Sequence, residues 1–291
     1  MIIVFHSITG GAGRTLLALA TALTLARSGS RVAVIDTDFE APSIYLYSRS
    51  PEEALRKLEN REARDFFTLL LWGLGPGRED LFKVGYDGLE VDALLTYPSL
   101  ETIDMVTFSW GTNIKYRSVF VHRTEAIAED LKNMGYDNVI IDARSGLAVP
   151  SQDLIAVADA VVEVIGRATS IELKRVVDTF PLLYKGIRER RIQPKRVPQS
   201  LLPVLNMVPQ EALKTITGGL DEQINNTIAE LRNRINGQAS AVQIIGPITL
   251  PWIQELALPG QRSPRPRDLL QIAVERLEEN INDMLKMILK R

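Results

Sequence analysis

Short apolar runs alternate with longer segments of mixed apolar and polar residues along most of this chain. Nearly continuous apolar runs are typical of strands buried in a parallel sheet, whereas apolar residues spaced three and four apart indicate helices. We expect strands at 2–5, 31–35, 160–165, 201–208 and 241–246, and another in the run that ends at Asp142. We expect helices at 15–27, 122–134, 171–184 and 268–291, and a polar helical stretch within 209–237.

This alternation predicts an α/β fold with a doubly wound, mostly parallel sheet and helices on both faces. We expect residues 1–291 to form a single domain. Its least interpretable segment is 51–120, which begins with a charged helix from 51 to about 64 and includes strand-like pieces such as 89–91. The apolar stripe 66–72 precedes a Gly/Pro break, which is typical of a core helix, with a partner surface as the alternative.

Composition excludes several classes of function. The 291 residues include no cysteine, so disulfides, thiolate metal sites and cysteine nucleophiles are absent. The only two histidines, His6 and His122, argue against a histidine metal site. A net charge of −2 gives no whole-chain attraction to nucleic acid. No apolar run is long enough to span a bilayer, and 2–5 is too short for a signal-peptide core, so we expect a cytoplasmic protein.

The most informative stretch follows the first apolar run. A Gly-rich turn ends in a cation and a hydroxyl, and an Ala/Leu-rich helical pattern follows. Strand, glycine loop and helix together form a phosphate cradle, because glycines let backbone N–H groups point inward and the helix N-terminus attracts anions. The candidate nucleotide-binding residues are Gly10, Gly11, Ala12, Gly13, Arg14, Thr15 and Leu16. A strand–helix turn without a ligand is the alternative.

The loop resembles the deviant P-loop of the ParA/MinD family of ATPases. The usual P-loop reads G-x-x-x-x-G-K-S/T, and the family version reads K-G-G-x-G-K-S/T. Here Thr9 stands where the family has its signature Lys, and Arg14 replaces the P-loop Lys, as in the G-G-x-G-R-T version. The resemblance implies that Arg14 contacts the β- and γ-phosphates of ATP and that the Thr15 hydroxyl ligates Mg²⁺.

Two further motifs carry the resemblance. Asp36 and Asp38 end a strand where the family carries D-x-D, which implies that Asp36 helps to hold the Mg²⁺ shell and Asp38 orients the attacking water. Asp142 to Gly146 reads D-A-R-S-G, similar to the branch of the family whose phosphate loop carries Arg. There Asp142 would accept from a Mg²⁺-bound water, and the Gly146 N–H would approach the γ-phosphate. Capping acids at strand ends are the alternative for both motifs.

Two later segments resemble the parts of the family that contact the adenine base of the nucleotide. Asn206 falls where the family has an Asn whose amide reads the adenine edge, since an amide offers a donor and an acceptor together. A strand-end turn is the alternative for this residue. Residues 247–252 read as a loop that resembles the base-contacting segment of the family, with any contact made through backbone.

Charge patterns bear on the partners. Residues 185–196 form the densest basic stretch, which is either a solvated face or a patch for non-specific DNA binding through phosphates. The helix at 268–291 is amphipathic, and either packs on the sheet or lies on a membrane as in MinD. Glu275, Glu278 and Glu279 on its polar face disfavour anionic lipid, so we expect no membrane binding.

The resemblance implies a protein that binds ATP and Mg²⁺, forms an ATP-dependent homodimer and acts as a slow ATPase switch in DNA partition or in positioning a cellular assembly. Thr9 lacks the charge and reach of the signature Lys, so another cation, Arg144 or Arg167, would replace it. The alternative is a non-hydrolysing, nucleotide-stabilised scaffold of the pilus-positioning type. A small-molecule enzyme such as an amidoligase is a distant third, because no second substrate site is apparent. The protein partner stays open.

Overall fold

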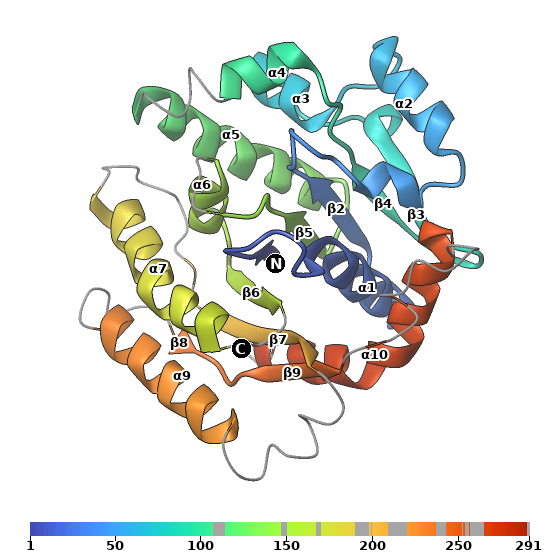
Figure 1. The fold of residues 1–291 in the computed structure, drawn as a ribbon. Coiled ribbons are helices and arrows are strands. Elements are labelled where there is room, and N and C mark those ends of the chain that lie inside the picture. The colour runs from blue at the N-terminus through green and yellow to red at the C-terminus, as the bar shows by residue number, and fades with distance from the viewer. Residues whose placement is uncertain are drawn as a thin grey trace.

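The computed structural model describes residues 1–106, 114–146, 150–166, 170–189, 198, 200–208, 220–236, 243–251, 253, 256 and 265–289. Within them, one nine-stranded sheet runs through the molecule, with helices on both faces (Figure 1). The strand order is β3-β4-β2-β5-β1-β6-β7-β8, and β9 also pairs with β7. The expected α/β fold with a mostly parallel sheet is confirmed.

The central strands are parallel and mostly apolar, as is typical of strands that are buried on both faces of a sheet. They are β1 (Ile2–His6), β2 (Val32–Asp36), β5 (Asn138–Asp142), β6 (Ala160–Gly166) and β7 (Ser200–Val208). In the register, Asp142 lies beside both Phe5 and Asp36, and His6 lies beside Glu163. The carboxyl ends of these strands therefore meet at one edge of the sheet, where α/β proteins bind ligands.

Two hydrophobic clusters flank the sheet. One lies under α1 (Arg14–Arg27), α2 (Pro51–Glu59) and α10 (Pro266–Leu289). The other lies under α3 (Phe66–Trp72), α5 (Ile114–Asn133), α6 (Ser151–Ala156), α7 (Ser170–Glu189) and α9 (Leu220–Asn236). The structure also contains a short helix, α4 (Leu100–Asp104), and two 3-10 turns at Ile44–Tyr47 and Arg78–Asp80.

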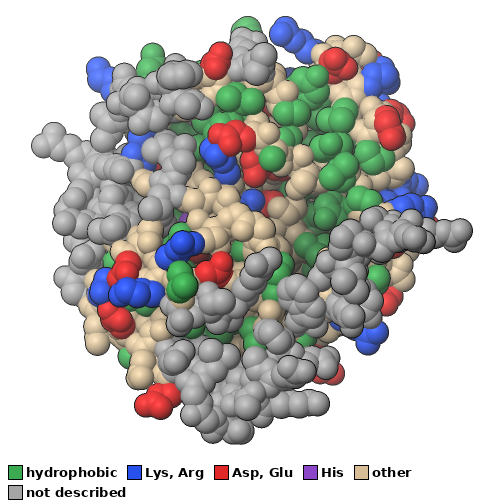
Figure 2. All heavy atoms as spheres, in the orientation of Figure 1, with side chains coloured by type: hydrophobic (Ala, Val, Ile, Leu, Met, Phe, Trp, Pro, Cys, Tyr) green, Lys and Arg blue, Asp and Glu red, His purple; other side chains and the backbone are tan. Residues whose placement is uncertain are grey.

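The segment 51–120 forms an edge of the fold. The strand-like piece at 89–91 belongs to β4 (Leu89–Leu94), which makes an antiparallel hairpin with β3 (Leu81–Tyr86) and a parallel pair with β2. The charged helix from 51 ends at Glu59 rather than near 64, because Arg61 takes a φ of 57° and the backbone turns back on Lys57. In Figure 2, hydrophobic side chains gather on the viewed face between α2 and α10.

The stripe at 66–72 is a core helix, as expected. Phe66, Phe67, Leu69 and Leu70 are buried, and the two phenylalanine rings meet edge to face with centroids 5.1 Å apart. Trp72 at the end of α3 differs, since 74% of it is exposed. The expectation that the stripe is core is therefore wrong at its last residue, where helix α3 ends at the left-handed residue Gly73.

The carboxyl-terminal part differs from the sequence expectation in two places. Residues 248–251, expected to be a loop, form β9 (Ile248–Pro251), which pairs with β7 across a register shift near Met207. The strand expected at 241–246 is reduced to β8 (Gln243–Ile244) in the described residues. Helix α10 packs on α1 and also contacts the sheet at β3 and β9 (Ile248–Pro251), as the closing-helix interpretation expected. Within the part of the chain that the structure describes, no helix has the length and apolar character needed to cross a bilayer.

Candidate functional site

The glycine loop joins β1 to α1 in the middle of the sheet. Gly11 and Gly13 have φ of 72° and 77°, a region that side chains rarely adopt. Gly13 precedes α1 directly, and the helix begins without a side-chain cap and without an acid in its first turn. The first N–H groups of a helix have no acceptor within the helix, so this end of α1 offers donors and a positive dipole to an anion.

Asn206, at the end of β7, lies against this loop. Its Nδ2 donates to the carbonyl of Ala12 at 2.8 Å, and its Oδ1 accepts from the N–H of Met207 at 2.9 Å. A Cβ on Gly13 would lie 2.5 Å from that Nδ2, which is why the position needs glycine. The amide of Asn206 thus supports the loop backbone in this structure, and its role toward adenine stays a prediction.

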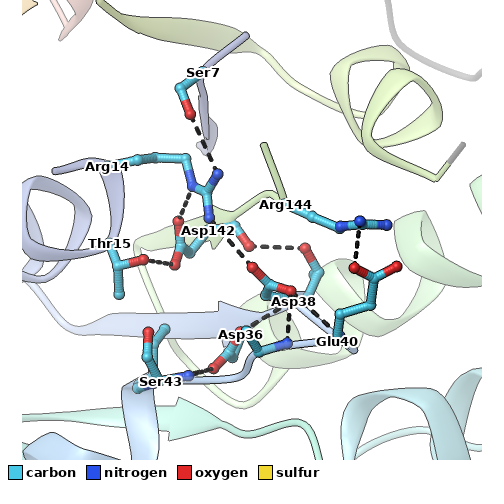
Figure 3. Close-up of polar contacts among 12 residues, drawn as sticks. Ser7, Arg14, Thr15, Asp36, Asp38, Glu40, Ser43, Asp142 and Arg144 are labelled. Atoms are coloured by element: carbon cyan, nitrogen blue, oxygen red, sulfur yellow. Dashed lines mark hydrogen bonds and ion pairs between the residues drawn. The ribbon is translucent and has the colours of Figure 1, made fainter. Parts of the chain in front are cut away.

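Thr15 and Asp142 meet at the N-terminus of α1 (Figure 3). The Thr15 hydroxyl donates to Oδ2 of Asp142 at 2.6 Å, and Nε of Arg14 donates to Oδ1 of the same carboxylate, also at 2.6 Å. Asp142 is 1% exposed. The glycine-loop motif and the motif at Asp142 therefore meet in the folded protein, because Arg14 and Thr15 both bind the buried Asp142 carboxylate, 127 residues away from Thr15 in the sequence.

The Arg14 side chain lies among acids rather than in solvent. Its Nη1 donates to the hydroxyl of Ser7 at 3.3 Å, and its Nη2 is 3.8 Å from Oδ2 of Asp38. Burial acts to lower the pKa of Arg14, but the neighbouring carboxylates, Asp142 first, raise it overall, so the guanidinium stays charged. It supplies positive charge to a site with three carboxyl groups.

Asp36 organises the loop that follows β2. Its Oδ1 accepts from the N–H of Asp38 at 3.0 Å, and its Oδ2 accepts from Ser43 at 3.3 Å and Ile44 at 3.1 Å. Burial, aided by the charge of Asp142, raises the pKa of Asp36 to about 7. Both oxygens of Asp36 already accept hydrogen bonds from backbone N–H groups. Asp36 would therefore influence a bound metal through its charge rather than as a direct ligand.

The loops after β2 and β5 are joined by a charged pair. Arg144 donates to Glu40, and its guanidinium carbon lies 5.1 Å from the centre of the Phe39 ring. Asp38 accepts from the N–H groups of Glu40 and Ala41. Arg144, expected as a substitute for the missing Lys, is therefore close to the site but paired with a neighbouring acid. Arg167, the other candidate, lies outside the described residues, as do 190–196 of the basic stretch.

Gly146 lies directly against the phosphate loop. It has a φ of 94°, and its N–H donates to the carbonyl of Ser7 at 2.8 Å. Its own carbonyl lies 3.0 Å from Nε2 of His6. In this structure the N–H expected to reach a γ-phosphate bonds to the protein, and that role stays a prediction.

Sequence reasoning missed three residues of this site: Ser7, His6 and Glu163. Nδ1 of His6 lies 2.6 Å from Oε2 of Glu163, and neither residue is exposed. Glu163 interrupts an otherwise apolar strand, which was the available signal for a buried polar pair. Thr9, the departure from the family loop, places its hydroxyl 3.5 Å from Oε1 of Glu172.

The residues present fit a magnesium–nucleotide complex. Mg²⁺ prefers oxygen donors and is usually held by one or two carboxylates together with substrate phosphates. Thr15 and Asp142 supply a hydroxyl and a carboxylate beside the N-terminus of α1, where a phosphate would lie. Among the described residues, no group of three or more acidic, histidine or cysteine side chains could hold a metal ion by itself.

Comparisons with known proteins identify the family. The family model described as the CobQ/CobB/MinD/ParA nucleotide binding domain matches residues 3–288, so this chain belongs to that family. No significant match is found among curated protein sequences.

Several solved structures have the same fold as this chain. The pNOB8 ParA structure has a TM-score of 0.68 at 16% identity, covering 99% of this chain and 97% of that one. The Cyanothece McdA(D38A)–ATP complex has a TM-score of 0.62 at 14% identity, covering 99% and 96%. A plasmid partition protein described as putative, from Borrelia burgdorferi B31 and bound to AMPPNP, has a TM-score of 0.56 at 19% identity, covering 99% and 98%. At these identities the likeness establishes the fold.

Proposed function

We propose that this protein binds ATP with Mg²⁺ at the loop between β1 and α1. The observation that carries the proposal is the contact of the Thr15 hydroxyl with the Asp142 carboxylate, 2.6 Å apart, at an uncapped helix N-terminus. Hydroxyl, carboxylate and backbone donors converge there as a metal–phosphate complex requires. Family membership and the nucleotide-bound structures of McdA and the Borrelia protein support the same ligand.

The loop residues divide the task of holding the ligand. The backbone from Gly10 to Leu16 would surround the phosphates, and Arg14 would turn from Asp142 toward them. Thr15 and Asp142 would hold Mg²⁺. Asp36, which lies beside Asp142 in the sheet, would add negative charge near the metal. Bound Mg²⁺ would neutralise negative charge on the phosphates.

Hydrolysis would use the acid nearest to solvent in this cluster. The Asp38 side chain is 18% exposed, against 1% for Asp142, and lies on the loop after β2. From there its carboxylate can orient a water toward a terminal phosphate. Phosphoryl transfer depends chiefly on positioning and charge, so Arg14 and Arg144 would carry most of the electrostatic work that the residues of this chain supply.

The biological role that we propose is an ATP-dependent dimer that positions DNA or a cellular assembly. The Borrelia protein described as a putative plasmid partition protein has the same fold, and pNOB8 ParA has been solved bound to nonspecific DNA. The residues of the DNA patch expected at 185–196 fall mostly outside the described part of the chain, so this role rests on the family.

A second candidate is a nucleotide-stabilised scaffold that does not hydrolyse ATP. The observation that favours it is Thr9, which offers a short hydroxyl bonded toward Glu172 in place of a long cation. Without a cation reaching the partner's nucleotide, turnover would be far slower. Retention of ATP through purification, with a stable dimer and no turnover, would distinguish this candidate.

The test of ATP binding compares two hydroxyls on the same helix. Thr15→Ala removes the hydroxyl that faces Asp142, whereas Thr24→Ala removes one that bonds to the backbone of its own helix at Ala20. The affinity for a fluorescent ATP analogue is measured with Mg²⁺ and with a chelator. We expect Thr15→Ala to weaken Mg²⁺-dependent binding at least tenfold and Thr24→Ala to leave it nearly unchanged. Equal affinities for wild type and Thr15→Ala would contradict the proposal.

A further inference from the structure

His6 and Glu163 form a buried pair between two neighbouring strands. They lie side by side in the register of β1 and β6, and neither is exposed to solvent. Nδ1 of His6 is 2.6 Å from Oε2 of Glu163, and the other oxygen, Oε1, accepts from the N–H of Ile8 at 3.0 Å. Nε2 of His6 is 3.0 Å from the carbonyl oxygen of Gly146. All four polar atoms of the two side chains therefore have partners.

The partners fix where the protons are. A backbone carbonyl only accepts, so Nε2 of His6 must carry a hydrogen to bond with Gly146. A second hydrogen must lie between Nδ1 and Oε2, because two bare acceptors would repel at 2.6 Å. The pair thus holds one proton more than a neutral imidazole and a carboxylate would. It is neutral as a unit, which avoids the large cost of burying a net charge.

This pair touches both sides of the proposed nucleotide site. Ile8 lies in the chain leading into the glycine loop, and Gly146 lies in the loop that follows Asp142. The N–H of Gly146 bonds to Ser7, next to His6, so Gly146 is held through both its N–H and its carbonyl. Apolar side chains would fill the space between β1 and β6 without any desolvation of charge, so packing alone does not require this pair.

We propose that His6 and Glu163, sharing one proton, are positioning residues that hold Gly146 against the phosphate loop and thereby set the affinity for nucleotide. The inference rests on the proposed function, since it assumes that this loop binds ATP. Neither side chain touches the ligand. They act through the backbone of Ile8 and Gly146.

The proton arrangement is tested first, by NMR of the protein labelled with ¹⁵N in its histidines. The chain has only His6 and His122, so His122→Gln assigns the spectrum without altering the pair. At neutral pH we expect a hydrogen on Nε2 of His6 and a strongly hydrogen-bonded Nδ1. A His6 ring with bare Nε2 would overturn the inference. This measurement needs neither nucleotide nor a variant of the pair.

The positioning role is tested with variants matched for stability. The double variant His6→Phe/Glu163→Leu replaces the pair by apolar side chains, and His122→Gln removes the other histidine as a control. In Glu163→Gln, the side-chain amide can still donate to Nδ1 and its oxygen can still accept from Ile8, so the link to Gly146 is kept. Affinity for a fluorescent ATP analogue with Mg²⁺ is measured, and urea unfolding monitors stability.

We expect the double variant to unfold at a urea concentration close to that of wild type but to bind the analogue at least tenfold more weakly. The affinity of Glu163→Gln should stay within about threefold of the wild-type value, because the glutamine amide can make the same hydrogen bonds to His6 and Ile8 without a charge. Wild-type affinity in a folded double variant would overturn the positioning role while leaving ATP binding intact. If wild-type protein itself bound no nucleotide, the proposed function would fail, and the affinity claim made here with it. If the double variant did not fold, Glu163→Leu alone would be measured in its place, and wild-type affinity in that folded variant would equally overturn the positioning role.

Discussion

Nε of Arg14 donates to Oδ1 of Asp142 across 2.6 Å, so the cation of the phosphate loop pairs with the acid expected to serve a bound metal. The Thr15 hydroxyl occupies the other oxygen of the same carboxylate. A bound metal–nucleotide complex would compete with Asp142 for both of these side chains, since its phosphates would attract Arg14 and its metal would bind the Thr15 hydroxyl. If the loop binds phosphate as we propose, Arg14 would have to leave Asp142 to reach the phosphates.

Removing Arg14 should destabilise the protein. In Arg14→Ala, Asp142 would remain buried without its ion pair, which costs about 3–5 kcal/mol when one partner of a buried pair is lost. Arg49→Ala is the matched control, because Arg49 makes a two-pronged pair with Glu90 at 2.7 and 2.8 Å but is 71% exposed in its side chain. Urea unfolding measures both. Similar losses for the two variants would show that burial of the Arg14 pair is not decisive.

The stability contribution of Asp36 should fall as pH rises. Its pKa is raised to about 7 in the folded protein, above the ordinary value of 3.8, so the folded state binds the proton more tightly than the unfolded state does. The stability associated with protonated Asp36 is therefore complete below about pH 4 and is lost as pH rises toward about 7. At about 1.4 kcal/mol per pKa unit, the total is a few kcal/mol.

The check is the difference between wild type and Asp36→Asn, which cannot titrate at this position. Unfolding free energies are measured from pH 4 to pH 8 without nucleotide or divalent cation. We expect wild type to lose stability relative to Asp36→Asn across that range. Parallel curves for the two proteins would mean that the Asp36 carboxyl has no raised pKa.

Arg144 should contribute to turnover rather than to nucleotide affinity. It pairs with Glu40 and stacks near Phe39, so it must leave Glu40 to approach a phosphate. We expect Arg144→Ala to reduce ATP turnover at least tenfold with little change in affinity, and Glu40→Ala to leave turnover equal or higher. Turnover assays beside binding titrations test both. Unchanged turnover in Arg144→Ala would remove it as the substitute for the missing Lys.

The two ends of α3 should respond differently to truncation. Phe67 is fully buried against Phe66 and Phe39, so Phe67→Ala should cost about 3–5 kcal/mol through lost burial and a cavity. Trp72 is 74% exposed, so Trp72→Ala should change the free energy of unfolding little. Urea unfolding followed by circular dichroism measures both without relying on tryptophan fluorescence. A large loss in Trp72→Ala would place this side chain in the core after all.

Much of the fold follows from pattern. The mostly apolar runs located every central strand, because a strand buried on both faces carries few polar residues along its length. The same pattern failed at 248–251, where alternate positions are only partly buried and the short run lies between Pro247 and Pro251. It also failed to end the charged helix at Glu59, since the stop depends on the positive φ of Arg61 and no Gly marks it.

The site was predictable only in part. Glycine spacing and strand-end acids pointed to Arg14, Thr15, Asp36 and Asp142, and the structure brings these side chains together. Their present partners could not be read from the sequence, because Arg14 could equally have pointed outward. The His6–Glu163 pair was missed, since it depends on the register between β1 and β6. Whether Asn206 reads adenine stays a prediction.

The proposed function depends above all on the binding of ATP with Mg²⁺ by this loop through Asp142. The most direct measurement is ATP turnover by the purified protein with Mg²⁺, combined with extraction of nucleotide from the same preparation, for wild type and Asp142→Ala. We predict ATP or ADP in the wild-type extract and its loss in Asp142→Ala, with any turnover lost in that variant as well. Turnover lost in Asp38→Ala with nucleotide retained would add that Asp38 is catalytic. A wild-type protein with neither bound nucleotide nor turnover would contradict the account and leave only the fold.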